Sequence, residues 1–136
     1  MRNAGFSIIE LMVVIVIVGI LAVVSVSSMR DPIERGRAKN AEFTLLSIYS
    51  AQKRYLLNER RYFICDSATP RGEKVFEIAR NLQIKIDDVF FDYNITDFGA
   101  SGFQAMATRK DGLCADKQMN LTSENSTVDK RGCDIW

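Results

Sequence analysis

The side chain best placed to do specific chemistry is Glu10, a single carboxylate near the start of a long apolar run. Moving a carboxylate into hydrocarbon costs roughly 2.5–3.5 kcal/mol even on lenient insertion scales, so such a residue needs a partner. No cation lies within one helical turn of Glu10 in the full-length chain. Cleavage of the bond between Gly5 and Phe6 would create one, because it frees the α-amine of Phe6. The spacing therefore indicates an acid–amine pair that forms only after proteolysis.

Other chemistry is poorly represented in this sequence. Histidine is absent, which removes the commonest general base and the commonest metal ligand. The cysteines form no C-x-x-C pair, so a zinc site is not expected. Four aspartates cluster in the second half of the chain, but they lack EF-hand spacing and are interpreted as solvated strand ends rather than a calcium site: Asp87, Asp88, Asp92 and Asp97. We therefore expect no catalytic residue, no metal and no cofactor.

Three cysteines leave one pairing to choose. The leading apolar run implies export, and an exported domain can carry a disulfide. We expect Cys114 to pair with Cys133, because that bond would hold the end of the chain in place. Cys65 is then left over, although pairings of Cys65 with either of the others stay open on the sequence alone.

The charge balance favours self-association over nucleic-acid binding. The formal net charge is +1, and loss of Arg2 with the first five residues would bring it to zero. A near-neutral chain has no basic footprint for nucleic acid and does not hold its own copies apart. The pairs Arg109-Lys110 and Lys130-Arg131 are accordingly interpreted as ordinary surface charge rather than DNA contacts.

Residues 6–26 are apolar except for Ser7, Glu10 and Ser25. As a helix this segment would be about 31 Å long, which matches the hydrocarbon core of a bilayer. A soluble domain of this size is too small to cover a helix that is apolar on all faces. A signal peptide cleaved after Ser27 is the main rival, and the acid at the head of the run argues against it. Short-range Lys and Arg counts favour a cytoplasmic C-terminus, which conflicts with the export that we expect.

The helical pattern continues beyond the apolar run. Asp31, Pro32 and Glu34 form a helix-start signature, with Asp31 as a possible N-cap and Glu34 as the capping-box acid. Apolar or neutral residues then recur at three- and four-residue spacing: Ala38, Ala41, Leu45, Ile48, Gln52 and Tyr55. We expect one long helix over residues 6–57 with a bend near 27–36. Its front half, 6–28, would be the transmembrane helix, apolar on all sides, and 29–57 its amphipathic continuation.

Residues 58–136 predict a small globular domain packed on the amphipathic half of the helix. A short helix is expected around 75–82 and a short strand at 84–86. Alternating patterns predict strands at 91–95 and 103–107, joined by a hairpin at 99–102, and a third strand near 117–122. The fold class is therefore α+β, a long N-terminal helix on a small antiparallel sheet.

The block Gly5-Phe6-Ser7-Ile8-Ile9-Glu10-Leu11, followed by the apolar run with Gly19, resembles the N-terminus of the type IV pilin and pseudopilin superfamily. The stretch Tyr55–Tyr62 also resembles the end of the pilin helix. Many pilins have a proline at the position occupied here by Ser27, whereas this chain has Pro32. We therefore expect Gly19 and Pro32 to be the flexible points of the helix.

The resemblance implies a processing and assembly route. Residues 1–5 would be a leader removed by a membrane prepilin peptidase, which would also N-methylate Phe6. Glu10 would accept the Phe6 amine of a neighbouring subunit, and an inner-membrane platform with its ATPase would drive subunits into a homopolymer. The chain would sit in the bacterial inner membrane and then in a surface pilus or a periplasmic pseudopilus. Nucleic acid would be contacted only through DNA uptake by a pilus.

The function expected from the resemblance is that of a structural pilin supporting adhesion, motility or DNA uptake, not an enzyme. A pseudopilin of type II secretion is the first alternative. A plain membrane-anchored binding domain is the second, and it would retain Met1 and tolerate loss of Glu10.

Overall fold

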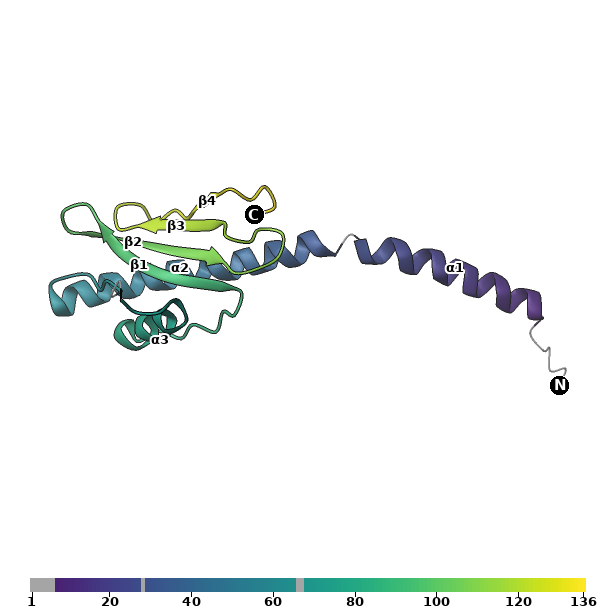
Figure 1. Cartoon of the computed structure of the whole chain (residues 1–136), viewed down its shortest axis with the longest axis horizontal. Helices are drawn as coiled ribbons and strands as arrows, with labels where there is room; N and C mark the ends of the chain where they lie inside the picture. Colours follow the sequence, from purple (N-terminus) through teal and green to yellow (C-terminus); the bar gives the residue numbers. More distant parts are fainter. Residues whose placement is uncertain (1–6, 28, 66–67) are drawn as a thin grey trace. The chain divides into compact units, whose positions relative to one another are not determined.

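The structure is a computed structural model that describes residues 7–27, 29–65 and 68–136. The chain divides into two compact units between Ile33 and Glu34. The elements in chain order are α1 (Ile8–Ser27), α2 (Arg30–Glu59), α3 (Arg71–Leu82), β1 (Phe91–Phe98), β2 (Gly102–Arg109), β3 (Gln118–Thr122) and β4 (Asp129–Arg131). The expected α+β class, a long helical N-terminus followed by a small antiparallel sheet, is confirmed (Figure 1).

The expected single helix is divided into two. Helix α1 ends at Ser27 and α2 begins at Arg30, within the stretch where a bend was predicted. Pro32 lies in the first turn of α2, where its missing N–H removes no intrahelical hydrogen bond. Helix α2 ends at Glu59, and Arg60 follows with a left-handed φ of 60° while its N–H bonds to the carbonyl of Leu56.

One side of α2 forms the core with the inner face of the sheet. The predicted stripe is confirmed over most of its length: Tyr55 at its end is half-buried, and the other members are buried, namely Ala38, Ala41, Leu45, Ile48 and Gln52. The strands contribute alternate residues to the same core: Phe91, Tyr93, Ile95, Phe103, Ala105, Ala107, Met119 and Leu121. In Figure 1 α2 runs behind the sheet and α3 lies alongside β1.

The buried amide of Gln52 joins α2 to the segment that follows it. Its Nε2 donates to the carbonyl of Phe63 at 2.6 Å, and its Oε1 accepts from the Phe63 N–H at 2.9 Å. The amide of Gln52 thus pairs with the backbone of Phe63 in the way that a neighbouring strand would. This reciprocal pair explains how a polar residue can be wholly buried without cost from unsatisfied groups.

Outside the fully buried stripe, α2 carries hydroxyls that bond within the helix. Thr44, Ser47 and Ser50 each donate to the carbonyl four residues earlier, at 3.0 Å. Phe43 and Leu57 also lie outside the buried stripe of α2, and they are 71% and 80% exposed.

The sheet has the order β1-β2-β3-β4, with every neighbouring pair antiparallel. The first three strands and the hairpin after Phe98 agree with the sequence prediction, and Gly99 supplies the left-handed turn residue with φ 66°. The expected strand at 84–86 is wrong: these residues have no strand structure, and Ile84 and Ile86 pack half-buried against the core instead. Strand β4 was not predicted.

Candidate functional site: the apolar helix and its acid

Glu10 lies in the first turn of α1. The N–H groups of Glu10 and Leu11 bond to the carbonyl of Ser7 at 3.0 and 3.2 Å, which starts the helix at this point. The carboxylate is exposed in the isolated chain. Helix N-termini attract negative charge, so an acidic residue suits this position. Gly5 and Phe6, the predicted cleavage and methylation residues, lie outside the described residues.

The surface of α1 is apolar on every side that the structure describes. Its large apolar side chains from Ile8 to Val23 have exposed fractions between 51% and 81%. A helix with no polar face is normally buried in a core or in lipid. The exposed side chains of α1 therefore require a partner or a lipid environment to cover them. Gly19 stands within it, and a Cβ added there would meet nothing within 4 Å.

Among the described residues, no helix has both the length and the apolar character needed to cross a membrane.

A second constellation joins Glu34 on α2 to Arg109 at the end of β2. Arg109 Nε and Nη2 donate to the two carboxylate oxygens of Glu34 at 2.6 and 3.0 Å. Both side chains are buried, with Arg109 at 0% and Glu34 at 4% side-chain exposure. The hydrogen bond from Arg109 lowers the pKa of Glu34 despite its burial, and the same bond raises the pKa of Arg109.

This pair corrects two sequence expectations. Glu34 does not serve as a surface capping-box acid, because its carboxylate is committed to Arg109 across the core. Arg109 is not a surface charge, because it is fully buried. Its neighbour Lys110 is exposed and pairs with Asp92 at 3.2 Å. No local pattern could have revealed a contact between residues 75 positions apart.

Cys114 and Cys133 form a disulfide, which is the pair chosen from the sequence. Cys65 is a free, buried thiol, and its burial raises its pKa. The bond ties the last segment of the chain to the loop between β2 and β3.

The aspartates do not form one site. Asp88 is buried and accepts hydrogen bonds from the Tyr93 hydroxyl at 2.6 Å and from the Phe90 N–H at 2.8 Å. Burial and then this hydrogen bond raise the pKa of Tyr93 well above its usual range. Within the ranges that the structure covers, no three acidic, cysteine or histidine side chains gather as a metal site would require.

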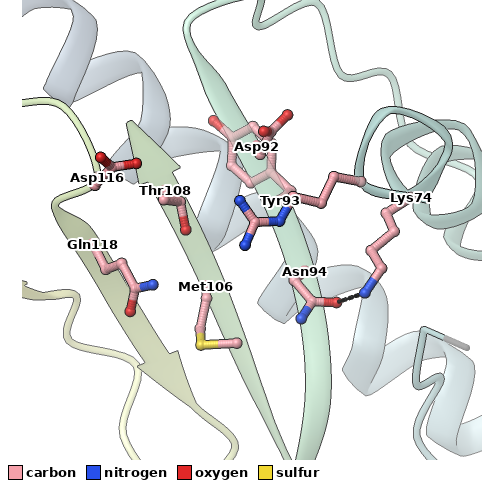
Figure 2. A pocket seen from close by; sticks show the side chains of 9 residues that line it. Lys74, Asp92, Tyr93, Asn94, Met106, Thr108, Asp116 and Gln118 are labelled. Carbon is pink, nitrogen blue, oxygen red and sulfur yellow. Dashed lines mark hydrogen bonds between the residues drawn. The ribbon is translucent and has the colours of Figure 1, made fainter. Parts of the chain in front are cut away.

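A hollow of about 380 Å³ lies between the outer face of the sheet and α3 (Figure 2). Its lining carries both signs of charge, with Arg71 and Lys74 from α3 and Asp92 and Asp116 from the sheet and its loop. Lys74 Nζ donates to Asn94 Oδ1 at 3.2 Å. Thr108 on β2 and Gln118 on β3 lie on neighbouring strands, as Figure 2 shows.

Comparison with known proteins finds similarity at the N-terminus of the chain. The pattern described as the prokaryotic N-terminal methylation motif matches residues 1–26. A stretch of 61 residues, 45% of this chain, is 38% identical to the type IV major pilin protein PilA of Myxococcus xanthus (strain DK1622). The match spans 28% of that relative, just over a quarter of its length. No solved structure matches the chain. The chain therefore carries the N-terminal methylation motif, and its resemblance to the type IV pilin superfamily is confirmed.

Proposed function

We propose that the chain is a structural subunit of a type IV pilin-like filament that assembles through α1. The observation that carries this proposal is a helix that is apolar on all described sides and has its single acid in the first turn, within the methylation motif. A relative of the same superfamily is a type IV major pilin, which supports the structural rather than enzymatic role.

The proposed route begins with removal of residues 1–5 by a prepilin peptidase and methylation of the new terminus at Phe6. The subunit waits in the inner membrane, where lipid covers α1. An assembly platform and its ATPase then transfer it into the filament, where other copies cover the same surface. Lipid covers the apolar side chains of α1 before assembly, and protein covers them afterwards. Each Å² of apolar surface kept from water stabilises the subunit by about 25 cal/mol.

Glu10 is proposed to pair with the Phe6 amine of a neighbouring copy. A buried ion pair contributes little net stability, because desolvation offsets most of the attraction. An unpaired buried carboxylate is costly, however, so the pair rejects wrong registers between subunits. We therefore assign Glu10 the role of setting register, while the apolar surface supplies the stability.

The first experiment is intact mass and N-terminal sequencing of the protein in filaments sheared from cells. A mature chain that begins at methylated Phe6 supports the proposal. A native chain that still begins at Met1 would indicate a plain anchor, and one that begins beyond residue 26 would indicate a signal peptide. The location of the filaments distinguishes a surface pilus from a periplasmic pseudopilus.

The second experiment compares Glu10→Ala with Glu124→Ala, an exposed acid of the globular unit. We expect the Glu10 variant to reach the membrane at normal level but to give at least tenfold fewer filaments, and the control to assemble normally. Normal filament yield from Glu10→Ala would contradict the assigned role.

A further inference from the structure

Two segments that are far apart in the sequence cover the buried Glu34–Arg109 pair. The first is the loop after β2, where a Cβ added to Gly112 would lie 3.3 Å from Arg109 Nη2 and 3.9 Å from Glu34 Oε2. The second is the end of the chain, Trp136. Its ring centroid lies 5.9 Å from that of Phe91, and the Arg109 guanidinium carbon lies 5.4 Å from the same Phe91 centroid. The ion pair is therefore enclosed by a loop and by the C-terminus.

Trp136 also acts on the Glu34 carboxylate directly. The hydrogen bond from Arg109 is the largest cause of the lowered pKa of Glu34, and the indole of Trp136 lowers that pKa further. The indole N–H is buried and closes no hydrogen bond within the described chain. This donor therefore faces the carboxylate without being fully satisfied, and the position of Trp136 matters to the pair.

The last residues of the chain, 132–136, have few ties to the rest of the fold. They follow β4 without forming a strand or helix, and we call them the C-terminal strap. In the part of the chain that the structure describes, residues 132–135 make no hydrogen bond or ion pair with another segment. The Trp136 N–H bonds within the strap, to the Cys133 carbonyl at 3.4 Å. The disulfide to Cys114 and the packing of Trp136 on Phe91 are therefore the contacts that hold the strap in place.

The disulfide joins the two covers of the ion pair to each other. Cys114 belongs to the loop that carries Gly112, and Cys133 belongs to the strap that carries Trp136. The Cα atoms of the two cysteines are 5.7 Å apart. In Figure 1 the C-terminus and the loop after β2 lie at the same end of the globular unit, residues 34–136. One covalent bond thus keeps both covers over the pair.

The pair in turn attaches the first turn of α2 that belongs to the globular unit. Glu34 is the first buried residue of α2, and Ala38 is the next. Between them, Gly36 is a poor helix former, and a Cβ added there would meet nothing within 4 Å. Arg37 adds a partly exposed contact, with its guanidinium carbon 4.1 Å from the centroid of the Phe90 ring. The turn 34–37 therefore depends mainly on Glu34 for its hold on the sheet.

We propose that the C-terminal strap is a redox-sensitive lock, which seals the Glu34–Arg109 pair while its disulfide is closed and releases the turn 34–37 of α2 when the disulfide is opened. The lock goes beyond the proposed function, because it lies within the globular unit. It can be tested on single subunits, so its failure and the failure of filament assembly are separate results.

A dithiol is the reagent that opens the lock. Cys114 is 1% exposed whereas Cys133 is half-buried, so a thiolate attacks Cys133 Sγ and Cys114 leaves as a thiolate. The second thiol of the reagent then releases Cys133 by forming the reagent's own disulfide. Two electrons and two protons pass from the dithiol to the two cysteines, and oxidising conditions reverse the exchange.

Hydrogen exchange followed by mass spectrometry tests the lock on the full chain in detergent. The chain is compared with its disulfide closed and after mild reduction with dithiothreitol, and alkylation confirms which thiols are open. The readout is the exchange rate of residues 34–38 divided by that of residues 45–52 on the same helix. Loss of a disulfide speeds exchange everywhere by lowering global stability, and this ratio removes that shared effect.

We expect the ratio to rise at least tenfold on reduction, because the turn 34–37 opens while the rest of α2 stays on the sheet. Cys65→Ser should show the same rise, since Cys65 is a free thiol outside the lock. An unchanged ratio, with both segments losing protection by the same factor, would overturn the proposal. This comparison uses the wild-type sequence, so it does not depend on whether any variant folds.

Two further variants test the route from the strap to the pair. With the disulfide closed, Trp136→Ala should raise the ratio at least tenfold, whereas Trp136→Phe keeps a ring against Phe91 and should raise it less than threefold. Glu34→Gln should raise the ratio in the bonded chain but add less than twofold after reduction, because the two changes release the same turn. A wild-type ratio in Trp136→Ala, or independent effects of Glu34→Gln and reduction, would refute the lock.

Discussion

Glu34 and Arg109 form a forked ion pair that connects the first turns of α2 to the last residue of β2. The two N–H···O distances are 2.6 and 3.0 Å. The remaining guanidinium group, Nη1, donates to the Phe90 carbonyl and to Asp111, both at 2.9 Å. One side chain thereby holds together the start of a helix, the residue before β1 and the loop after β2. Glu34 is also the first residue of the second unit, 34–136, so this pair attaches the first part of α2 in that unit to the end of β2.

Removing one partner should be strongly destabilising. Glu34→Gln leaves the buried guanidinium without its counter-charge, and such losses typically cost about 3–5 kcal/mol. We expect a lower thermal unfolding midpoint for the full chain in detergent, followed by circular dichroism. The double variant Glu34→Met/Arg109→Leu removes both charges and should be more stable than either single one. A double variant with the summed loss of both would contradict this account.

The same pair predicts how stability depends on pH. Its hydrogen bond lowers the pKa of Glu34 in the folded state, so the unfolded chain takes up the proton first as pH falls. The stabilisation is then complete above the ordinary glutamate value of about 4.3 and is lost as pH drops through the lower folded value. Unfolding midpoints of wild type and Glu34→Gln should therefore converge as the pH falls below about 4.3, the ordinary glutamate value. A constant gap between them would argue that charge is not the cause.

Gly112 lies close to the same guanidinium. Its φ is 87°, a left-handed conformation, and a Cβ there would lie 3.3 Å from Arg109 Nη2. Gly112→Ala should therefore destabilise the chain by about 1–3 kcal/mol through backbone strain and crowding of the ion pair. Gly72→Ala is the control, because its Cβ would meet nothing within 4 Å. Equal unfolding midpoints for the two variants would refute this explanation.

The disulfide between Cys114 and Cys133 should stabilise the end of the chain. With a sequence separation of 19 residues, its loss is expected to cost about 3 kcal/mol. Cys114→Ser/Cys133→Ser should lower the unfolding midpoint accordingly, whereas Cys65→Ser, which removes no bond, should change it less. Mass spectrometry after alkylation checks the pairing: only Cys65 should react in the unreduced, unfolded chain.

Local patterns were enough to predict most of the elements. The alternation of Phe91, Tyr93 and Ile95 with polar residues predicted β1, because a strand with one buried face must alternate. The spacing of Ala38, Ala41, Leu45 and Ile48 predicted the buried side of α2 for the corresponding reason in a helix. The motif around Glu10 predicted the candidate site, since an acid in an apolar run is conspicuous in sequence alone.

Features that depend on distant partners were missed. Strand β4 has three charged residues and no alternation, and it exists because it pairs with β3. Ile84 and Ile86 alternate like a strand, but they form no strand and pack half-buried against the core as an irregular segment. Arg109 looks like surface charge until the fold brings Glu34 to it. In each case the deciding interaction lies far away along the chain.

Three hydroxyls of α2 that bond within the helix change how the surface around them responds to burial. Thr44, Ser47 and Ser50 already direct their hydrogens to carbonyls of the preceding turn. Burying a hydroxyl without a hydrogen-bond partner is normally unfavourable. These three donors already have partners, so this part of α2 can lose its water without leaving them unsatisfied. This surface of α2 is polar by sequence, and it can nevertheless be buried in a contact that excludes water.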